Sequence, residues 1–154
     1  MWAYESVFYQ MNVLRLCGAP DENDGILGHR ILTIKDWIPH IKSLGADAVF
    51  LSPVFSSDSS GFEIRDYRAI DCRLGSREDF KEICRALHLG GIRVVLDGVF
   101  HQVSRNFFAF ADVCSHREAS PYADWFFVDF AGDNDYQDGF SYEGGKGHPQ
   151  LAML

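Results

Sequence analysis

The chain lacks long apolar runs, positive charge and paired cysteines, and each shortage excludes a class of protein. The longest apolar runs, such as residues 94–96, are far shorter than the ~20 residues of a membrane helix, so no membrane span is expected. Lys and Arg number 14 against 22 Asp and Glu, and the net charge of −8 argues against nucleic acid and charged lipid as partners.

The four cysteines are widely scattered and include no C-x-x-C pair, which suggests neither a zinc site nor a disulfide framework. We expect reduced and mostly buried thiols at Cys17, Cys72, Cys84 and Cys114. The N-terminus has no basic start followed by an apolar stretch and a cleavage site, so no secretory signal is visible and a cytoplasmic location is expected.

What the chain does contain is an ordinary globular composition, with 47% hydrophobic and 23% charged residues, which predicts a packed core. At roughly 150 residues per domain, 154 residues amount to one domain or a piece of a larger one. Strand-like and helix-like stretches alternate in the order βαβαβ. The expected strands cover residues 6–11, 47–53 and 93–100, and a long polar stretch, residues 54–75, follows the second.

The first helix is indicated by apolar residues at helical spacing from Trp37 to Leu44, with Gly45 as its stop. We prefer Asp36 as its N-cap, because Pro39 then lies in the first turn, where a missing N–H loses no partner.

The second helix has the strongest local signals. It begins with a capping box at residues 76–79, carries an apolar stripe over residues 80–87 and ends at two glycines, residues 90–91. Beyond Phe100 no periodicity is visible, and residues 102–154 are expected to form an excursion from the sheet.

Parallel strands joined by helices, with long loops after the strand ends, are typical of a doubly wound sheet or an eight-fold (β/α) barrel. A closed barrel takes eight strands and roughly 250 residues, so a barrel would be incomplete here. The first strand is not followed by a G-x-G-x-x-G motif, which argues against dinucleotide binding.

Four patches invite a functional interpretation at one rim of the sheet: residues 9–10, 61–67, 97–102 and 139–144. Asp97 by itself fits a structural role, such as capping a loop or pairing with an arginine, as well as a functional one. The 13 Phe, 6 Tyr and 3 Trp side chains could stack on sugar rings, although aromatic side chains mostly fill cores.

Taken together, these segments resemble one family, the α-amylase superfamily of glycoside hydrolases (family 13). Residues 66–71 and 74–80 are similar to the family's D-Y-x-x-I-D and G-T-x-E-D-F elements, and their spacing is very specific. Residues 91–100 resemble the family's first signature region, on the third barrel strand. Further similar segments are residues 7–10, 47–53, 120–127 and 140–144.

The resemblance implies an α/β fold, here a partial (β/α)8 TIM barrel. Residues 1–101 would hold its first three strands and two helices. Residues 102–154 would hold much of a loop-rich domain inserted after the third strand, ending before the fourth strand. The resemblance also implies a retaining α-glycosidase of carbohydrate metabolism that acts on an α-glucan or maltooligosaccharide and needs no cofactor.

The candidate substrate-binding residues match the family's site motifs, several of them with altered side chains. His101 and Gln102 stand where the family usually has Asn and His, and Phe62 and Glu63 stand where it has Tyr and Asp. Asp97 matches a residue that supports an arginine beside the nucleophile. Because His101 replaces an asparagine that often binds calcium, no calcium or zinc site is expected.

Retaining glycosidases need two carboxyl groups about 5–5.5 Å apart, one as nucleophile and one as acid/base. In the family these follow the fourth and fifth barrel strands, so this chain alone is predicted to be inactive. Because a short sheet has open edges, we expect self-association or a complementing C-terminal chain. One alternative is a non-catalytic sugar-binding or decayed derivative of the family. Another is an unrelated flavodoxin-like binding domain, which the lack of apolar runs in the tail disfavours.

Overall fold

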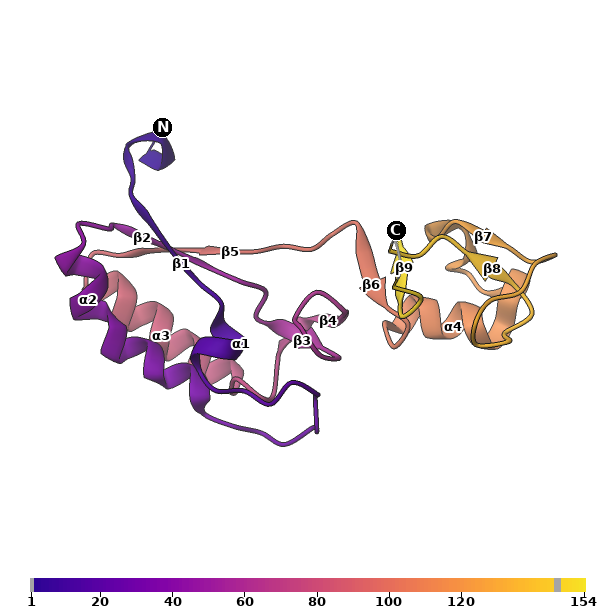
Figure 1. Ribbon diagram of the computed structural model, residues 1–154, viewed down its shortest axis with the longest axis horizontal. Helices are drawn as coiled ribbons and strands as arrows, with labels where there is room; N and C mark the ends of the chain where they lie inside the picture. Colours follow the sequence, from indigo (N-terminus) through magenta and orange to yellow (C-terminus); the bar gives the residue numbers. More distant parts are fainter. Residues whose placement is uncertain (1, 146–147) are drawn as a thin grey trace.

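Three parallel strands form the main sheet of the computed structural model, which describes residues 2–145 and 148–154. The strands are β1 (Phe8–Met11), β2 (Ala48–Leu51) and β5 (Arg93–Leu96), in the order β1-β2-β5 (Figure 1). A short 3-10 turn, η1 (Trp2–Glu5), precedes β1. The three predicted strands are therefore confirmed, as is their parallel pairing.

The third strand is shorter than predicted, because it ends at Leu96 rather than at Phe100. Its neighbour β2 ends at Leu51, and the backbone N–H of Asp97 donates to the Leu51 carbonyl at 2.9 Å. Pro53, two residues beyond β2, has no N–H with which to continue the ladder. The pairing therefore stops at the carboxyl end of the sheet.

Helices cover one face of this sheet (Figure 1). They are η2 (Arg30–Trp37), a 3-10 helix, α2 (Ile38–Ser43) and α3 (Arg77–Leu89), while the single turn α1 (Val13–Leu16) follows β1. The predicted N-cap of the first helix was wrong, since η2 runs directly into α2 and Trp37 is the cap residue. Pro39 nevertheless lies in the first turn, as expected, where its missing N–H leaves no hydrogen bond unmade.

The α3 helix confirms the predicted capping box. The Ser76 hydroxyl accepts from the Asp79 N–H at 3.1 Å, and the Asp79 carboxylate accepts from the Ser76 N–H at 2.7 Å. At the other end Gly91 has φ +76°, a left-handed conformation that favours glycine.

The first hydrophobic core lies between these helices and the sheet. Alternate strand residues point into it, among them Met11, Val49 and Leu51, and the apolar stripe of α3 packs against them. On the opposite face of the sheet lie Phe8, which is 41% exposed, and Phe50. The sheet is thus covered by helices on one face only.

The predicted polar stretch over residues 54–75 contains a hairpin that the sequence analysis missed. Strand β3 (Phe55–Ser57) pairs antiparallel with β4 (Ile64–Ile70), with irregular register. Polar and charged side chains dominate β4, and its burial varies along the strand, so it gives little hydrophobic signal.

The C-terminal third forms a second hydrophobic core of its own, at one end of the elongated molecule in Figure 1. Helix α4 (Phe108–His116) buries Ala109, Phe110 and Val113 in this core. The sequence showed no periodicity over these residues and did not predict this helix. The remaining elements are β6 (Gln102–Ser104) paired with β9 (Leu151–Met153), β7 (Val128–Asp129) paired with β8 (Ser141–Tyr142), and the turns η3 (Arg117–Ala119) and η4 (Ala123–Trp125).

All four cysteines lie in the described part of the chain and carry free thiols, as predicted. Only Cys17 is buried, while Cys72, Cys84 and Cys114 are partly exposed, so the prediction of mostly buried thiols was wrong. Burial raises the pKa of the Cys17, Cys84 and Cys114 thiols above the ordinary value. Within residues 2–145 and 148–154, no helix is long and apolar enough to cross a bilayer.

The capping box predicts a pH-dependent stability. The Ser76 N–H hydrogen bond, assisted by His29 at 2.8 Å, outweighs burial and holds the pKa of Asp79 below its ordinary value of 3.8. A carboxyl with a lowered pKa stabilises the fold above its unfolded-state pKa, and this stabilisation is lost as the pH falls through the lowered value. Asp79→Asn should therefore reduce the free energy of unfolding at pH 7, by about 0.5–2 kcal/mol.

Urea denaturation of both proteins between pH 7 and pH 3 measures this effect. The difference in the free energy of unfolding between the wild type and Asp79→Asn should shrink below pH 4. Asp124→Asn, which replaces an exposed aspartate, is the matched control. A difference that stayed constant down to pH 3 would contradict the role of the Asp79 charge.

Candidate functional site

A pocket of about 300 Å³ opens where the hairpin loop of the first part meets the C-terminal part. Phe62 and Glu63 line it from one side, and Gln102 and His148 line it from the other. We call it the junction pocket; its full lining is Ser60, Phe62, Glu63, Gln102, Gly145, His148 and Leu151. Three of the five predicted site residues are thus brought together.

The loop that carries Phe62 is held by its own polar groups. Glu63 is only 8% exposed, and its carboxylate accepts from the Ser60 N–H and hydroxyl, both at 2.9 Å. Gly61 has φ +98°, and a Cβ there would lie 3.3 Å from a methyl carbon of Leu14. Glu63 therefore acts on the loop itself, while the 44% exposed ring of Phe62 stays free.

The two walls of the junction pocket are tied together by Tyr67 and Asp58. The Tyr67 hydroxyl donates to the backbone carbonyls of Val99 and Gln102, and burial raises its pKa. Asp58 accepts from the Ser104 hydroxyl and, at 3.0 Å, from the Asn106 side-chain amide. These contacts set the position of Gln102 relative to the hairpin.

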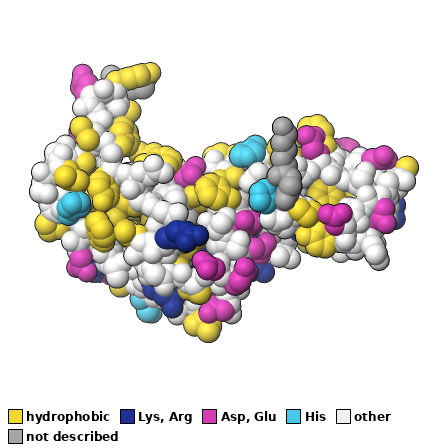
Figure 2. Space-filling view, in the orientation of Figure 1, with side chains coloured by type: hydrophobic (Ala, Val, Ile, Leu, Met, Phe, Trp, Pro, Cys, Tyr) yellow, Lys and Arg dark blue, Asp and Glu magenta, His cyan; other side chains and the backbone are white. Residues whose placement is uncertain are grey.

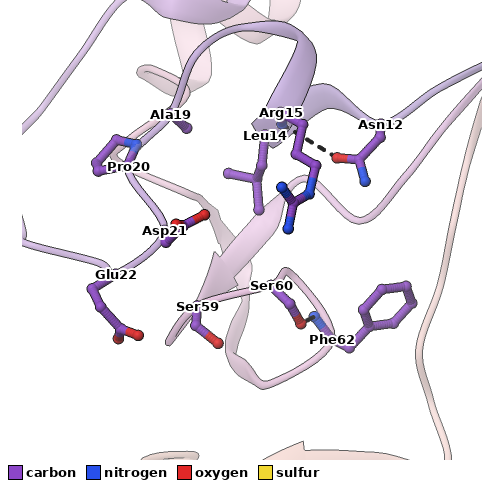
Figure 3. A pocket seen from close by; sticks show the side chains of 10 residues that line it. All are labelled: Asn12, Leu14, Arg15, Ala19, Pro20, Asp21, Glu22, Ser59, Ser60 and Phe62. Carbon is purple, nitrogen blue, oxygen red and sulfur yellow. Dashed lines mark hydrogen bonds between the residues drawn. The ribbon is translucent and has the colours of Figure 1, made fainter.

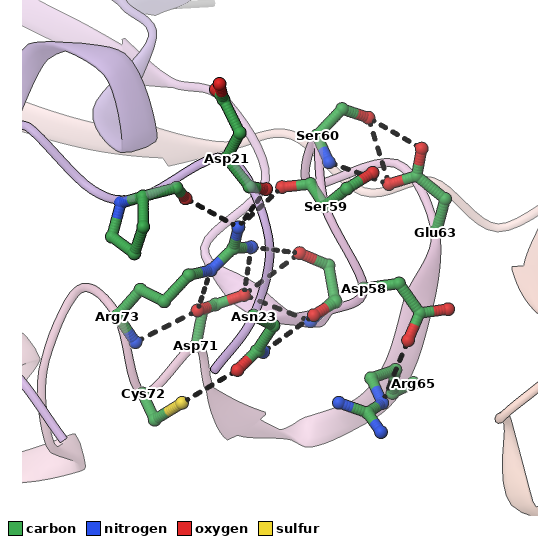
Figure 4. Close-up of polar contacts among 12 residues, drawn as sticks. Asp21, Asn23, Asp58, Ser59, Ser60, Glu63, Arg65, Asp71, Cys72 and Arg73 are labelled. Carbon is green, nitrogen blue, oxygen red and sulfur yellow. Dashed lines mark hydrogen bonds and ion pairs between the residues drawn. The ribbon is translucent and has the colours of Figure 1, made fainter. Parts of the chain in front are cut away.

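A fully buried ion pair organises the loops on the other side of the hairpin (Figure 4). Arg73 is 0% and Asp71 1% exposed, and the guanidinium donates to both carboxylate oxygens at 2.9 and 2.8 Å. Arg73 also donates to the Ser57 hydroxyl and to the carbonyls of Pro20, Asp21 and Ser59, all within 3.0 Å. Burial lowers the pKa of Arg73, but its bonds and attraction to Asp71 outweigh this and raise it.

The residues that carry these carbonyls line a second pocket, of about 430 Å³, beside α1 (Figure 3). We call it the α1 pocket; its lining is Asn12, Leu14, Arg15, Ala19, Pro20, Asp21, Glu22, Ser59, Ser60 and Phe62. Ser60 and Phe62 line both pockets, so the Phe62 ring stands on the border between them.

The other two predicted site residues are Asp97 and His101. Neither is among the described residues that line the two pockets. Asp97 follows the carboxyl end of β5 directly and is partly exposed, while His101 is exposed. Tyr9 was expected at the same rim, which was wrong: its ring packs toward the helices, 6.4 Å from Trp37 and 5.7 Å from His40. The reason is strand alternation, which turns Tyr9 into the first core.

Among the described residues, no three His, Cys, Asp or Glu side chains come together in a way that could hold a metal ion. The expectation that neither calcium nor zinc is required stays a prediction.

A family model described as alpha amylase, catalytic domain, matches residues 23–143. The chain belongs to this α-amylase family. The resemblance identified from the sequence motifs is therefore confirmed.

Curated members of the α-amylase family align with most of the chain. Neopullulanase 2 of Thermoactinomyces vulgaris is 32% identical over 145 residues, which are 83% of this chain and 25% of that protein. The intracellular maltogenic amylase of Bacillus subtilis (strain 168) is 32% identical over 125 residues, which are 80% of this chain and 21% of that protein. The chain spans about a quarter of the length of the curated relatives it matches.

Solved structures of α-amylase-family enzymes have the same arrangement over nearly all of this chain. A debranching enzyme from Nostoc punctiforme superposes with a TM-score of 0.81 at 30% identity, covering 99% of this chain and 36% of that one. The cyclic α-maltosyl-(1→6)-maltose hydrolase of Arthrobacter globiformis gives 0.79 at 29% identity, covering 99% and 38%.

The residues of the α1 pocket, above all Arg15, Asp21 and Glu22, were not predicted from the sequence. One signal pointed to them: residues 17–25 form a turn-rich loop after the first strand, on the rim where barrel folds place their sites. Their spacing matches no motif, and only the anchoring by Arg73 brings the loop opposite Arg15.

The buried pair predicts a large effect of Arg73→Met. The substitution leaves the Asp71 carboxylate buried without a cation, which should lower the free energy of unfolding by about 3–5 kcal/mol. Urea denaturation measures this, with Arg68→Met, an exposed arginine on β4, as control.

The double variant Asp71→Asn/Arg73→Met separates charge from packing. It removes the unpaired charge and should be more stable than Arg73→Met alone. If the double variant is less stable than Arg73→Met, the unpaired charge of Asp71 is not the cause of the lost stability.

Proposed function

We propose that this chain is part of an α-amylase-family glycoside hydrolase that acts on α-glucans. Residues 1–101 form the first three strands and two helices of its (β/α)8 barrel, and residues 102–154 form much of the domain inserted after the third strand. Support comes from the parallel β1-β2-β5 sheet with helices on one face and from the separate second core. Within this arrangement, we propose that the junction pocket binds the sugar.

The observation that carries the proposal is the exposed Phe62 ring, which lines two pockets that both contain polar side chains. An aromatic face can stack on the apolar face of a glucosyl unit, while Gln102 and His148 supply polar groups for its hydroxyls. A pocket of about 300 Å³ also lies within the range of small-ligand sites. Relatives are named for action on such sugars, and the Nostoc punctiforme enzyme has been solved after soaking with acarbose.

The five predicted site residues take different roles in this proposal. Phe62 stacks on the sugar, Gln102 bonds its hydroxyls, and Glu63 holds the loop through Ser60. Asp97 and His101 lie on the rim beyond the junction pocket. By its resemblance to the family, Asp97 supports an arginine rather than touching sugar.

Hydrolysis needs two facing carboxyl groups, and we place neither of them among these 154 residues. Glu63 is the one carboxylate that the described residues contribute to the junction pocket, and Ser60 already engages it. The same observation favours a second candidate function, a non-catalytic sugar-binding derivative of the family, in which Phe62 and Gln102 bind the ligand without cleaving it.

Phe62→Ala tests the sugar site. Loss of the aromatic face should weaken maltotriose binding by roughly 3- to 10-fold in titration calorimetry, because stacking contributes on the order of 1 kcal/mol. Phe127→Ala removes another exposed phenylalanine, 62% exposed and outside the lining of both pockets, and should leave the affinity unchanged.

Equal affinities for the wild type and Phe62→Ala would contradict the assignment of Phe62. Release of reducing sugar from maltopentaose by the 154-residue chain would contradict the absence of the catalytic carboxylates.

Self-association is expected through the uncovered face of the main sheet. Phe8 and Trp2 are 41% and 42% exposed there, and hydrophobic side chains are visible at the N-terminal end of the molecule in Figure 2. Strands β1 and β5 also present open edges.

Light scattering of the wild type should show dimers or larger species. Phe8→Lys should reduce the amount of these species, whereas the control Phe127→Lys should not. A monodisperse monomer would contradict this expectation.

A further inference from the structure

Six oxygen atoms surround the buried guanidinium of Arg73 and form a cage around it (Figure 4). The Asp71 carboxylate accepts from Nε and from one terminal nitrogen, Nη2, which also donates to the Ser57 hydroxyl. The other terminal nitrogen, Nη1, donates to the backbone carbonyls of Pro20, Asp21 and Ser59. All these distances lie between 2.8 and 3.0 Å, so each of the three nitrogen atoms is engaged.

The cage is also held together by bonds that do not involve the guanidinium. The Asp71 carboxylate accepts from the N–H and the hydroxyl of Ser57, at 3.1 and 2.9 Å, and the Asp71 N–H donates to the Val54 carbonyl at 2.9 Å. On the other wall, Asn23 donates from its side chain to the Ser57 carbonyl at 2.7 Å and from its backbone to the Asp58 carbonyl at 2.9 Å. These bonds keep the two walls near each other, so a cation supplied from solution would find most of the cage assembled.

The shape of the cage fits a flat cation rather than a spherical one. A calcium ion takes its oxygen ligands at about 2.3–2.6 Å from a single point. Here the oxygens lie around the three corners of a planar group, and they would have to move inwards to reach one point. A guanidinium matches this arrangement, because it presents five N–H donors in a fixed planar fork.

The charge of the cage fits a single positive charge. Among the residues that the structure describes, Asp71 is the one carboxylate in contact with the guanidinium, and its side chain is 1% exposed. The Ser57 hydroxyl and the three carbonyls are neutral. A divalent cation would leave an uncompensated positive charge in a buried site, which is costly.

We propose that this cage is a guanidinium-binding site that the chain fills with its own Arg73 side chain, so that a built-in monocation rather than a metal ion organises the loops beside α1. The carbonyls of the cage belong to residues of the α1 pocket, so occupancy of the cage sets the shape of that pocket. Removal of the side chain should turn the cage into an open site for a guanidinium from solution. The inference does not depend on sugar binding.

Chemical rescue of Arg73→Ala in the full 154-residue chain tests this proposal. The substitution keeps Cβ and removes a fragment whose free counterpart is the ethylguanidinium ion. Millimolar ethylguanidinium should raise the melting temperature of the variant by about 5 °C, because a ligand that binds only the folded state stabilises it. The wild type should not respond, since its cage is already filled.

Three matched probes separate the features that the ligand needs. Ethylammonium carries the same charge without the planar fork, ethylurea keeps planar N–H donors without the charge, and calcium is a spherical dication. None of them should raise the melting temperature of Arg73→Ala more than that of the wild type.

Two further variants serve as controls. Asp71→Asn/Arg73→Ala lacks the carboxylate and should lose the response to ethylguanidinium. Arg68→Ala removes an exposed arginine on β4 and should show no response either.

Rescue of Arg73→Ala by ethylguanidinium but not by the other three probes, and its loss in the double variant, would support the proposal. Equal rescue by ethylammonium or calcium would overturn it, because the cage would then accept any cation, and so would the absence of any response. If Arg73→Ala is unfolded in buffer, far-UV circular dichroism replaces the melting curve. Ethylguanidinium should then restore the helical signal, and a failure to restore it would equally overturn the inference.

Discussion

The buried pair of Arg73 and Asp71 is the interaction on which the irregular rim of the molecule depends. Loops have no ladder of backbone hydrogen bonds, so their carbonyls need other donors when they are buried. One guanidinium supplies these donors to the loop after β1 and to the β3–β4 hairpin together. A hydrophobic side chain of similar size would fill the space but would leave those carbonyls unpaired.

This anchoring links the core to the lining of the α1 pocket. Arg73 is fully buried, yet the backbone atoms it holds belong to residues that line the α1 pocket, such as Asp21 and Ser59. Tyr67 and Asp58 act in a similar way on the other side of the hairpin, where they join it to β6. The hairpin is therefore fixed from both sides, and Phe62 stands at its tip between two pockets.

Elements dominated by local signals were predicted correctly. Helix α3 has its cap, apolar stripe and terminal glycines within a short stretch, and strands β2 and β5 are recognisable as short apolar runs. The β3–β4 hairpin and α4 were missed for a common reason. The hairpin strands alternate only weakly between polar and apolar side chains, and α4 is apolar on several sides. Both elements are stabilised by packing against distant segments, so neither shows a clear hydrophobic period in the sequence.

The sequence by itself determined the family and the succession of strands and helices in the main sheet, because these depend on motifs and periodicities within short stretches. Only the tertiary structure decided which rim residues meet. Phe62, Glu63 and Gln102 share a pocket, whereas Asp97 and His101 stand apart from it. The partner that a polar side chain finds depends on which loops are brought together, and here a buried arginine brings them together.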